Sequence, residues 1–244
     1  MDLRVCSTRE EMGAASAAMA AEAIAQSIQR DGRAVVVFAS AVSQNEFLDA
    51  LASSDQLDWS KVTAFHLDEY IGVRADHPAS FRRFLHQKLW SRVQPAKFYE
   101  LAGEAADVEG EILRYSALLE EETPTIGFLG IGENGHLAFN DPPVDFNDPQ
   151  LVRVVELDEI CRMQQVHDGA FGGIGEVPRT AFTMTIPAIL RIPLLILNVP
   201  GLSKAEAVRN TVQGPLSPHC PASALQRHPH ATLFVDKDAA KLLS

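Results

Sequence analysis

Short apolar runs alternate with helical segments along this chain, and this alternation constrains the fold more than any other feature of the sequence. Residues 33–40, 62–67, 125–130, 194–199 and 231–235 are rich in aliphatic side chains and have the length of strands buried on both faces. Strands that alternate with helices predict a doubly wound, mostly parallel sheet with helices on both faces, a three-layer α/β/α fold.

The helices are expected between these runs. The first covers 7–30, where Ser7 or Thr8 can cap the N-terminus and Asp31-Gly32 ends the helix. The other expected helices are 45–53, 80–92, 107–122, 157–166 and 203–212. Because no repeat or linker interrupts the pattern, we expect residues 1–244 to form a single domain.

Composition and charge limit the partners of the chain. A net charge of −11 disfavours nucleic acid and membrane surfaces, which attract basic patches. The longest apolar stretch, 192–199, contains a proline and is too short to span a bilayer. Three cysteines without a CxxC pair indicate reduced thiols, and the N-terminus lacks a secretory pattern, so a soluble cytoplasmic protein is expected.

Four strand ends indicate where a ligand would bind. In an open parallel sheet, ligands occupy the crevice beyond the carboxyl ends of the strands. These ends fall after Ser40, at Asp68, after Gly130 and after Val199, and each carries polar or glycine-rich sequence. The sequence therefore predicts a pocket at this edge.

Two adjacent carboxylates, Asp68 and Glu69, stand at the second of these ends. A solvated turn is one explanation, since charged residues are common there. In the other, one carboxylate enters the crevice as a general base. To remove a proton beside a carbonyl, such a base needs a pKa raised towards neutrality by burial.

The loop after the third predicted strand is rich in glycine. Gly130, Gly132 and Gly135 nearly form the GxGxxG pattern of a dinucleotide site, but residues 136–142 follow in place of a small-residue helix. His136 is a candidate metal ligand. No second histidine lies at metal spacing, so a metal site is not expected.

The end at Val199 leads into the predicted helix 203–212, with Lys204 in its first turn. Helix N-termini and an ammonium group both favour an anion, so this end is suited to a phosphate. Ser40 and Ser43 add two hydroxyls at another helix start.

Taken together, these segments resemble the glucosamine-6-phosphate deaminase/isomerase family over nearly the whole chain. The loop that carries His136 is similar to the family's G-x-G-x-D-G-H-I-A-F-N-E-P signature, and the segment that carries Asp68 to its DEY-x-G. Further similar segments are 77–81, 177–184 and 221–229.

The resemblance implies an isomerase that deaminates glucosamine 6-phosphate to fructose 6-phosphate and ammonia through an enolamine, without a metal or organic cofactor. Asp68 would move the proton between C2 and C1 of the sugar. His136 would open the pyranose ring, with Asp141 orienting it. Asn134 takes the position where the signature has a further catalytic aspartate. The partner implied is a small sugar phosphate, and a homo-oligomer stays open.

The resemblance also implies the residues that hold the substrate. Lys204 would bind the phosphate together with the hydroxyls of Ser40 and Ser43. Further contacts are assigned to Glu69, Gly135 and Asn140. The family's arginine, in an N-S-R-F segment, has no counterpart here, and His167, or Arg162 from another direction, is the candidate substitute.

The departures from the family pattern keep alternatives open. Asn134 cannot titrate as an aspartate would, Asp141 is one methylene shorter than the usual glutamate, and Ala41-Val42 lack the glycine of the phosphate loop. Another sugar-phosphate isomerase, a 6-phosphogluconolactonase-like hydrolase and a non-catalytic sugar-phosphate sensor are the alternatives. Against the lactonase, its pattern is G-D-E-R, whereas this sequence has Asp68-Glu69-Tyr70. Against the sensor, which would be the effector domain of a transcription regulator, the sequence shows no DNA-binding segment.

Overall fold

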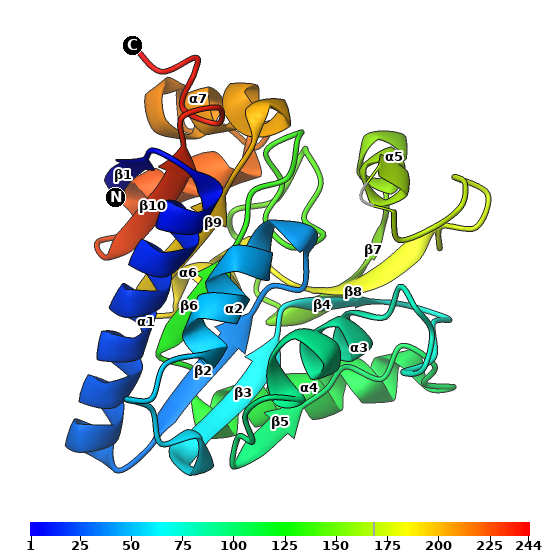
Figure 1. The fold of residues 1–244 in the computed structure, drawn as a ribbon. Helices are drawn as coiled ribbons and strands as arrows, with labels where there is room; N and C mark the ends of the chain where they lie inside the picture. Colours follow the sequence, from blue (N-terminus) through cyan, green and yellow to red (C-terminus); the bar gives the residue numbers. More distant parts are fainter. Residues whose placement is uncertain (168) are drawn as a thin grey trace.

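The computed structural model describes residues 1–167 and 169–244, and a seven-stranded parallel sheet runs through its centre (Figure 1). The strand order is β1-β10-β9-β6-β2-β3-β5. The strands are β1 (Asp2–Cys6), β2 (Ala34–Phe38), β3 (Val62–His66), β5 (Lys97–Tyr99), β6 (Ile126–Leu129), β9 (Leu194–Val199) and β10 (Ala231–Asp236). The predicted doubly wound, mostly parallel sheet is confirmed.

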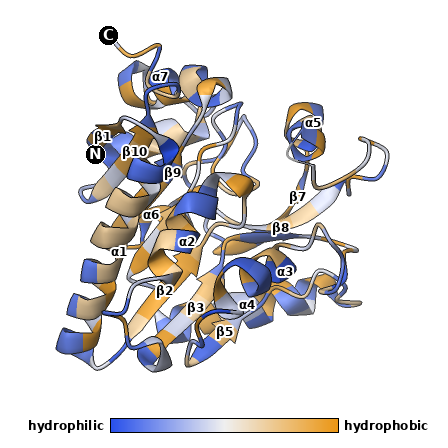
Figure 2. Ribbon diagram, viewed as in Figure 1, coloured by the Kyte–Doolittle hydropathy of each residue, from blue (hydrophilic) through white to orange (hydrophobic). Residues whose placement is uncertain are grey.

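Helices cover both faces of this sheet. The helices of the described residues are α1 (Arg9–Asp31), α2 (Asn45–Ala52), α3 (Phe81–Leu85), α4 (Val108–Glu122), α5 (Glu159–His167), α6 (Ile186–Leu190) and α7 (Ala205–Gln213), of which α5 lies apart from the main sheet (Figure 1). Side chains alternate along β2, so Val36 and Phe38 pack with α1 and α2, whereas Val35 and Val37 pack with α4, α6 and α7. Apolar strands therefore lie between two helical layers (Figure 2).

The first helix begins and ends as its sequence predicts. The Thr8 hydroxyl accepts a hydrogen bond from the backbone N–H of Glu11 at 3.1 Å, and Gly32 ends the helix with a left-handed φ of 76°. Because α1 packs along α2 and its first residue is Arg9, this guanidinium lies near the carboxyl edge of the sheet.

A second, smaller sheet lies beside the main one. Its three antiparallel strands are β4 (Asp68–Tyr70), β8 (Thr180–Met184) and β7 (Val152–Glu156), in the order β4-β8-β7. Leu67 joins the two sheets, because its N–H donates to the Phe38 carbonyl of the main sheet at 3.1 Å and its own carbonyl accepts from Met184 of β8 at 2.8 Å. The chain therefore enters the small sheet at Asp68.

Several elements differ from the prediction. No strand was predicted between 130 and 194, yet β7 lies there, and α5 covers Glu159–His167 where a helix over 157–166 was expected. The helix expected over 80–92 divides into α3 and a π-helical turn, His86–Trp90. Strands β1, β5 and β8 were not predicted. Among the described residues, no helix is long and apolar enough to cross a membrane.

Candidate active site

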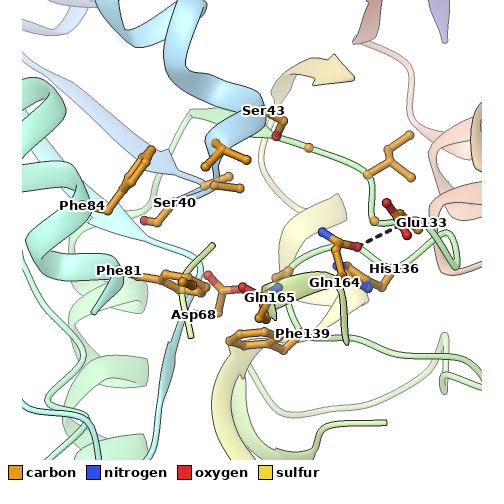
Figure 3. A pocket seen from close by; sticks show the side chains of 18 of the residues that line it. Ser40, Ser43, Asp68, Phe81, Phe84, Glu133, His136, Phe139, Gln164 and Gln165 are labelled. Carbon is orange, nitrogen blue, oxygen red and sulfur yellow. Dashed lines mark hydrogen bonds between the residues drawn. The ribbon is translucent and has the colours of Figure 1, made fainter. Parts of the chain in front are cut away.

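A cavity of about 340 Å³ opens at the carboxyl edge of the main sheet (Figure 3). All four predicted strand ends contribute to its wall, through Ser40, Asp68, Gly130 and Pro200. Further lining residues come from the loop that follows β6, from the segment 78–84 with the start of α3, from helix α5 and from the first residue of α1. The pocket therefore lies where the strand order predicts a ligand site.

Asp68 lies in this pocket as the first residue of β4. Its backbone pairs with Thr183 of β8, and the side chain is only 6% exposed. Burial raises the pKa of the Asp68 carboxyl well above its ordinary value, and the negative charge of Glu69 raises it further. A carboxyl under these conditions has the properties that the sequence interpretation requires of a general base.

Glu69 points away from the pocket and binds the scaffold. Its carboxylate accepts hydrogen bonds from the Ser80 hydroxyl at 2.8 Å, from the backbone of Phe81 and Arg82, and from the Arg82 guanidinium at 3.1 Å. The side chain is fully buried and does not line the cavity. The two adjacent carboxylates therefore lie in different surroundings, Asp68 in the pocket wall and Glu69 in the scaffold.

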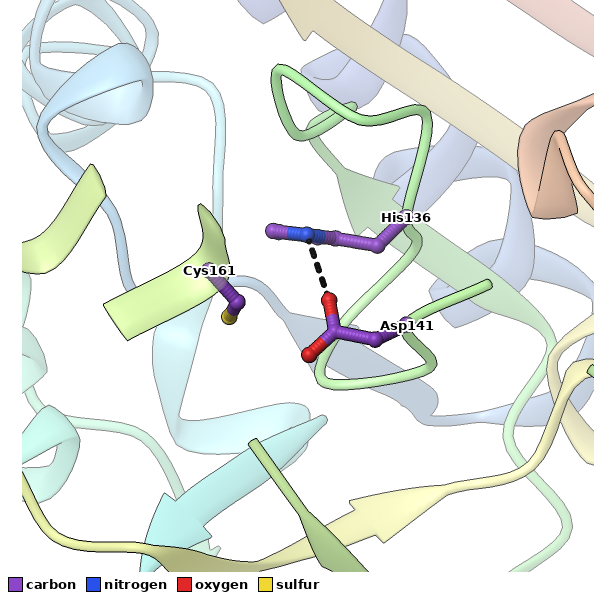
Figure 4. Close-up of side chains that lie close together, drawn as sticks. All are labelled: His136, Asp141 and Cys161. Atoms are coloured by element: carbon purple, nitrogen blue, oxygen red, sulfur yellow. Dashed lines mark ion pairs between the residues drawn. The ribbon is translucent and has the colours of Figure 1, made fainter. Parts of the chain in front are cut away.

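His136 faces the pocket from the glycine-rich loop. A Cβ at Gly132 would lie 2.3 Å from the imidazole ring, so only glycine leaves room for the ring in this position. Nδ1 of His136 lies 3.1 Å from Oδ1 of Asp141. The carboxylate lies below the ring rather than along the N–H direction, so the contact is electrostatic and Nδ1 keeps no hydrogen-bond partner (Figure 4).

Asn134 connects the two groups of this pair. Its amide nitrogen donates to Oδ1 of Asp141 at 3.1 Å, and its amide oxygen accepts from the His136 backbone N–H at 3.0 Å. Burial opposes ionisation of Asp141, but the nearby imidazole and amide outweigh it and hold the pKa of Asp141 below its ordinary value. Asn134 itself does not line the pocket.

Hydroxyl and cationic groups lie near the remaining part of the wall. The Ser40 hydroxyl is buried and has no hydrogen-bond partner among the described residues, and Ser43 lines the same pocket. Lys204, 8% exposed, belongs to the short helical turn before α7. The structure brings these three predicted residues to one pocket.

Arg9 is a lining residue that the sequence interpretation missed. Its Nε lies 3.0 Å from a carboxylate oxygen of Glu46 in α2, and its side chain is 42% exposed. It lies far in sequence from every predicted strand end, so no local motif marks it. Only the packing of α1 on α2 brings this second cation to the pocket.

Three further predicted residues lie outside the lining. Asn140 donates from its side chain to the carbonyls of Leu137 and Met184, both at 2.8 Å. Gly135 adopts a positive φ of 85° at the turn of the loop. His167 is exposed at the end of α5 and does not reach the pocket. The structure gives each of them a position in the scaffold or on the surface.

Helix α5 reaches the pocket through two glutamines instead. Gln164 accepts at its side-chain oxygen from the Glu133 N–H at 3.1 Å, and Gln165 accepts from the Tyr70 hydroxyl at 2.7 Å. Both line the cavity. Arg162, the other candidate substitute, donates to backbone carbonyls of the segment after α5. The sequence predicted this helix but not the face that it turns to the pocket.

One group of metal-binding side chains lies beside the pocket. Ligand atoms of His136, Asp141 and Cys161 all lie within 4.8 Å of one another (Figure 4). The sequence interpretation sought a second histidine and therefore did not consider Cys161, which α5 brings to the other two residues. Burial and the charge of Asp141 raise the pKa of the Cys161 thiol.

The geometry of the pocket agrees with the family that the sequence matches. Residues 7–234 match the family model described as glucosamine-6-phosphate isomerases/6-phosphogluconolactonase. The chain belongs to this family. Among curated relatives, the glucosamine-6-phosphate deaminase of Listeria innocua is 37% identical over 82% of this chain and 84% of its own length. That of Streptococcus pneumoniae serotype 4 is 36% identical over 87% and 89%.

Solved structures give the same result. A structure described as a monomeric glucosamine-6-phosphate deaminase of the NagB superfamily superposes with a TM-score of 0.92 and 32% identity, covering 99% of this chain and 100% of its own. The 6-phosphogluconolactonase of Trypanosoma brucei superposes with a TM-score of 0.83 at 17% identity, covering 100% and 98%. The second likeness shows the shared fold.

Proposed function

We propose that this protein is a glucosamine-6-phosphate deaminase, which converts glucosamine 6-phosphate and water into fructose 6-phosphate and ammonia. The observation that carries the proposal is the shared pocket of Asp68 and His136. A buried carboxyl with a raised pKa and an imidazole paired with a carboxylate face one cavity, with Lys204 and Arg9 in the same wall. Relatives of that name at 35–37% identity support it.

Ring opening is the first step, and His136 performs it. The imidazole transfers a proton from the C1 hydroxyl of the pyranose to the ring oxygen, which breaks the C1–O5 bond and leaves an aldehyde. Asp141 lies 3.1 Å from Nδ1, and its negative charge stabilises the imidazolium that forms during the transfer. Asn134 fixes this carboxylate by its hydrogen bond, a task that an amide performs as well as an acid.

Proton transfer between carbon atoms follows at Asp68. Its carboxylate removes the proton from C2, which lies next to the aldehyde, and the electron pair forms the C1–C2 double bond of an enolamine. The π pair of the aldehyde moves to O1, which takes a proton from water. The same proton then returns to C1, and the amine at C2 becomes an iminium. Water adds to C2 and ammonia leaves, so the product is the ketose. A base with a raised pKa is suited to this weakly acidic carbon.

The phosphate is bound at the wall that holds Ser40, Ser43, Lys204 and Arg9. The buried Ser40 hydroxyl has no protein partner among the described residues and is free to donate to a phosphate oxygen. Lys204 and Arg9 supply positive charge, which compensates for the missing family arginine and for Ala41-Val42 in place of glycine.

The chain acts, on this proposal, as one catalytic domain over 1–244 in the cytoplasm. The family match over 7–234 supports the first point. The cytoplasmic location is supported by the three cysteines, Cys6, Cys161 and Cys220, which are free thiols in the structure.

The direct test is turnover of glucosamine 6-phosphate, followed through ammonia release and fructose 6-phosphate formation. We expect both products in equal amounts. The matched substrate is 6-phosphogluconolactone, whose hydrolysis would favour the lactonase instead. Absence of ammonia at millimolar glucosamine 6-phosphate, with a folded protein by circular dichroism, would contradict the proposal.

A further inference from the structure

Cys161 places a thiol beside the proposed catalytic pair. The side chain is 1% exposed and belongs to α5, whereas His136 and Asp141 belong to the loop after β6. One imidazole nitrogen, one carboxylate oxygen and the thiol sulfur all lie within 4.8 Å of one another (Figure 4). A nitrogen, an oxygen and a sulfur donor therefore converge from two segments of the chain.

These donors favour one class of cation. Zn²⁺ and Cd²⁺ bind thiolate, imidazole and carboxylate together, whereas Mg²⁺ and Ca²⁺ select oxygen ligands. In a tetrahedral zinc site with bonds of about 2.0–2.3 Å, the ligand atoms are roughly 3.3–3.7 Å apart. The Nδ1–Oδ1 separation of 3.1 Å is close to this value, and the sulfur lies within 4.8 Å of the other two ligand atoms.

Two further observations indicate that a ligand is accommodated here. Nδ1 of His136 is buried without a hydrogen-bond partner, so one imidazole nitrogen stays available in a ring that is 8% exposed. The Asp141 carboxylate is already oriented, because one oxygen accepts from Asn134 and the other accepts from the Asp158 N–H at 3.2 Å. Such outer hydrogen bonds fix the ligands of protein metal sites.

Local charge also favours a cation. Two carboxylates lie beside Cys161, those of Asp141 and Asp158. Asp158 lies close, since one of its oxygens accepts from the Cys161 N–H at 2.6 Å. A divalent cation would be attracted by this negative surrounding, and its binding would release the thiol proton to solvent.

We propose that His136, Asp141 and Cys161 form a site for a thiophilic divalent cation of the Zn²⁺ class, and that its occupation inhibits the enzyme. The three side chains supply three ligands, and water from the pocket supplies the fourth. Binding holds the imidazole and the carboxylate on the metal, so neither can serve ring opening. The inhibition rests on the proposed function, whereas the binding does not.

The experiment measures binding without reference to activity. Cd²⁺ is titrated into the purified protein, and the ultraviolet charge-transfer absorption of the cadmium–thiolate bond is recorded. Zn²⁺ affinity is measured by competition with a chromogenic chelator. The variants are C161S and C161A, and the matched controls are C6S and C220S, which remove the other two thiols.

We expect one equivalent of Cd²⁺ with a thiolate band in the wild type and in both controls. The band should vanish in C161S and C161A, and Zn²⁺ affinity should fall at least tenfold. Where one Cys161 variant fails to fold, the other provides the measurement. A band that persists without Cys161, or an unchanged Zn²⁺ affinity, would overturn the site.

Inhibition is then measured with each variant's metal-free rate as its own reference. Zn²⁺ should inhibit the wild type and C220S reversibly, with recovery on adding a chelator. The C161S enzyme should require at least tenfold more Zn²⁺. Equal inhibition of C161S and C220S would refute the inhibitory role. A protein without deaminase activity that still shows the cadmium band would retain the site and lose only the proposed function.

Discussion

Two aspartates, one in the pocket wall and one beside the pocket, are held under opposite conditions. Asp68, at the start of β4, is surrounded by low-dielectric scaffold and the charge of Glu69, so its pKa is raised. Asp141, in the loop after β6, is held near an imidazole and an amide, so its pKa is lowered. Carboxyls whose surroundings move their pKa values apart usually divide the labour of acid–base catalysis. This difference supports a proton-transferring role for Asp68 and an orienting role for Asp141.

Replacing Asp68 tests the first half of this comparison and should have the largest effect. Asp68→Asn removes the base while keeping the shape and polarity of the side chain. We expect kcat to fall by roughly 10²–10⁴-fold, the usual contribution of a general base, with substrate affinity nearly unchanged. Single-turnover kinetics and equilibrium binding measure the two quantities. An equal loss of binding would argue that Asp68 holds the substrate instead.

Replacing Asp141 tests the second half and should have a smaller effect. An aspartate hydrogen-bonded to a catalytic histidine can contribute up to about 10⁴-fold. Since the contact with His136 lies outside hydrogen-bond geometry, we expect Asp141→Asn to lower kcat by roughly 10–100-fold. The measurement is the steady-state rate, with Asn134→Asp as the companion variant. A fall in kcat as large as that of Asp68→Asn would mean that the two aspartates contribute equally to catalysis, which would contradict the proposed division of roles.

The residues that we propose to hold the phosphate, Ser40, Ser43, Lys204 and Arg9, should affect binding more than chemistry. A hydrogen bond between charged groups contributes about 1.5–3 kcal/mol, so we expect Arg9→Ala to raise KM by roughly 10-fold or more with kcat nearly constant. Arg4→Ala, an exposed arginine in β1 outside the pocket, is the control. A fall in kcat at constant KM would place Arg9 among the groups that act in the transition state.

The smallest predicted effect concerns stability. The pKa of the Asp68 carboxyl is higher in the folded protein than in the unfolded chain. The stabilisation that this difference provides is therefore complete below the unfolded pKa, and it is lost as the pH rises through the folded pKa. The Asp68→Asn side chain does not ionise, so the variant keeps its stability as the pH rises. Its Tm should therefore exceed that of the wild type by a few degrees at neutral pH. The difference should shrink towards about pH 4, near the unfolded pKa. Thermal melts across this range provide the measurement, and a constant difference would exclude titration of Asp68 as its cause.

The wild-type pH–rate profile offers a second check on the same group. Because Asp68 must be ionised to accept the proton, kcat/KM should fall as the pH is lowered through its raised pKa. The acidic limb should therefore lie well above the ordinary aspartate range.

The buried strands and long helices could be predicted from the sequence, because their patterns extend over several residues. Strand β2, apolar throughout, and α1, capped at Thr8, are examples. Strand β1 was missed because this edge strand is mostly exposed and carries Asp2 and Arg4. Strand β5 has only three residues, and β4 was read as the end of β3, since no local signal shows that the chain changes sheets at Leu67.

Site residues could be predicted where a polar residue near a predicted strand end also lies in a segment that resembles the family. Asp68, His136 and Lys204 line the pocket as expected. Glu69 and Asn140 were assigned to the substrate, but sequence cannot tell which side of the chain a polar group faces, and their partners lie in the scaffold. Arg9, Gln164 and Gln165 were missed, because their positions depend on how helices pack.

The position of Leu67 between the two sheets has a consequence for how this enzyme can change. The backbone of Leu67 is hydrogen-bonded to β2 on one side and to β8 on the other, so the next residue, Asp68, is located by main-chain geometry. Loops that line the pocket can accumulate mutations without displacing Asp68, the residue that we propose as the base. Engineered specificity should therefore be sought in the segments around Ser43 and Gln165, where new side chains could change the sugar accepted while the proton-transfer machinery is inherited intact.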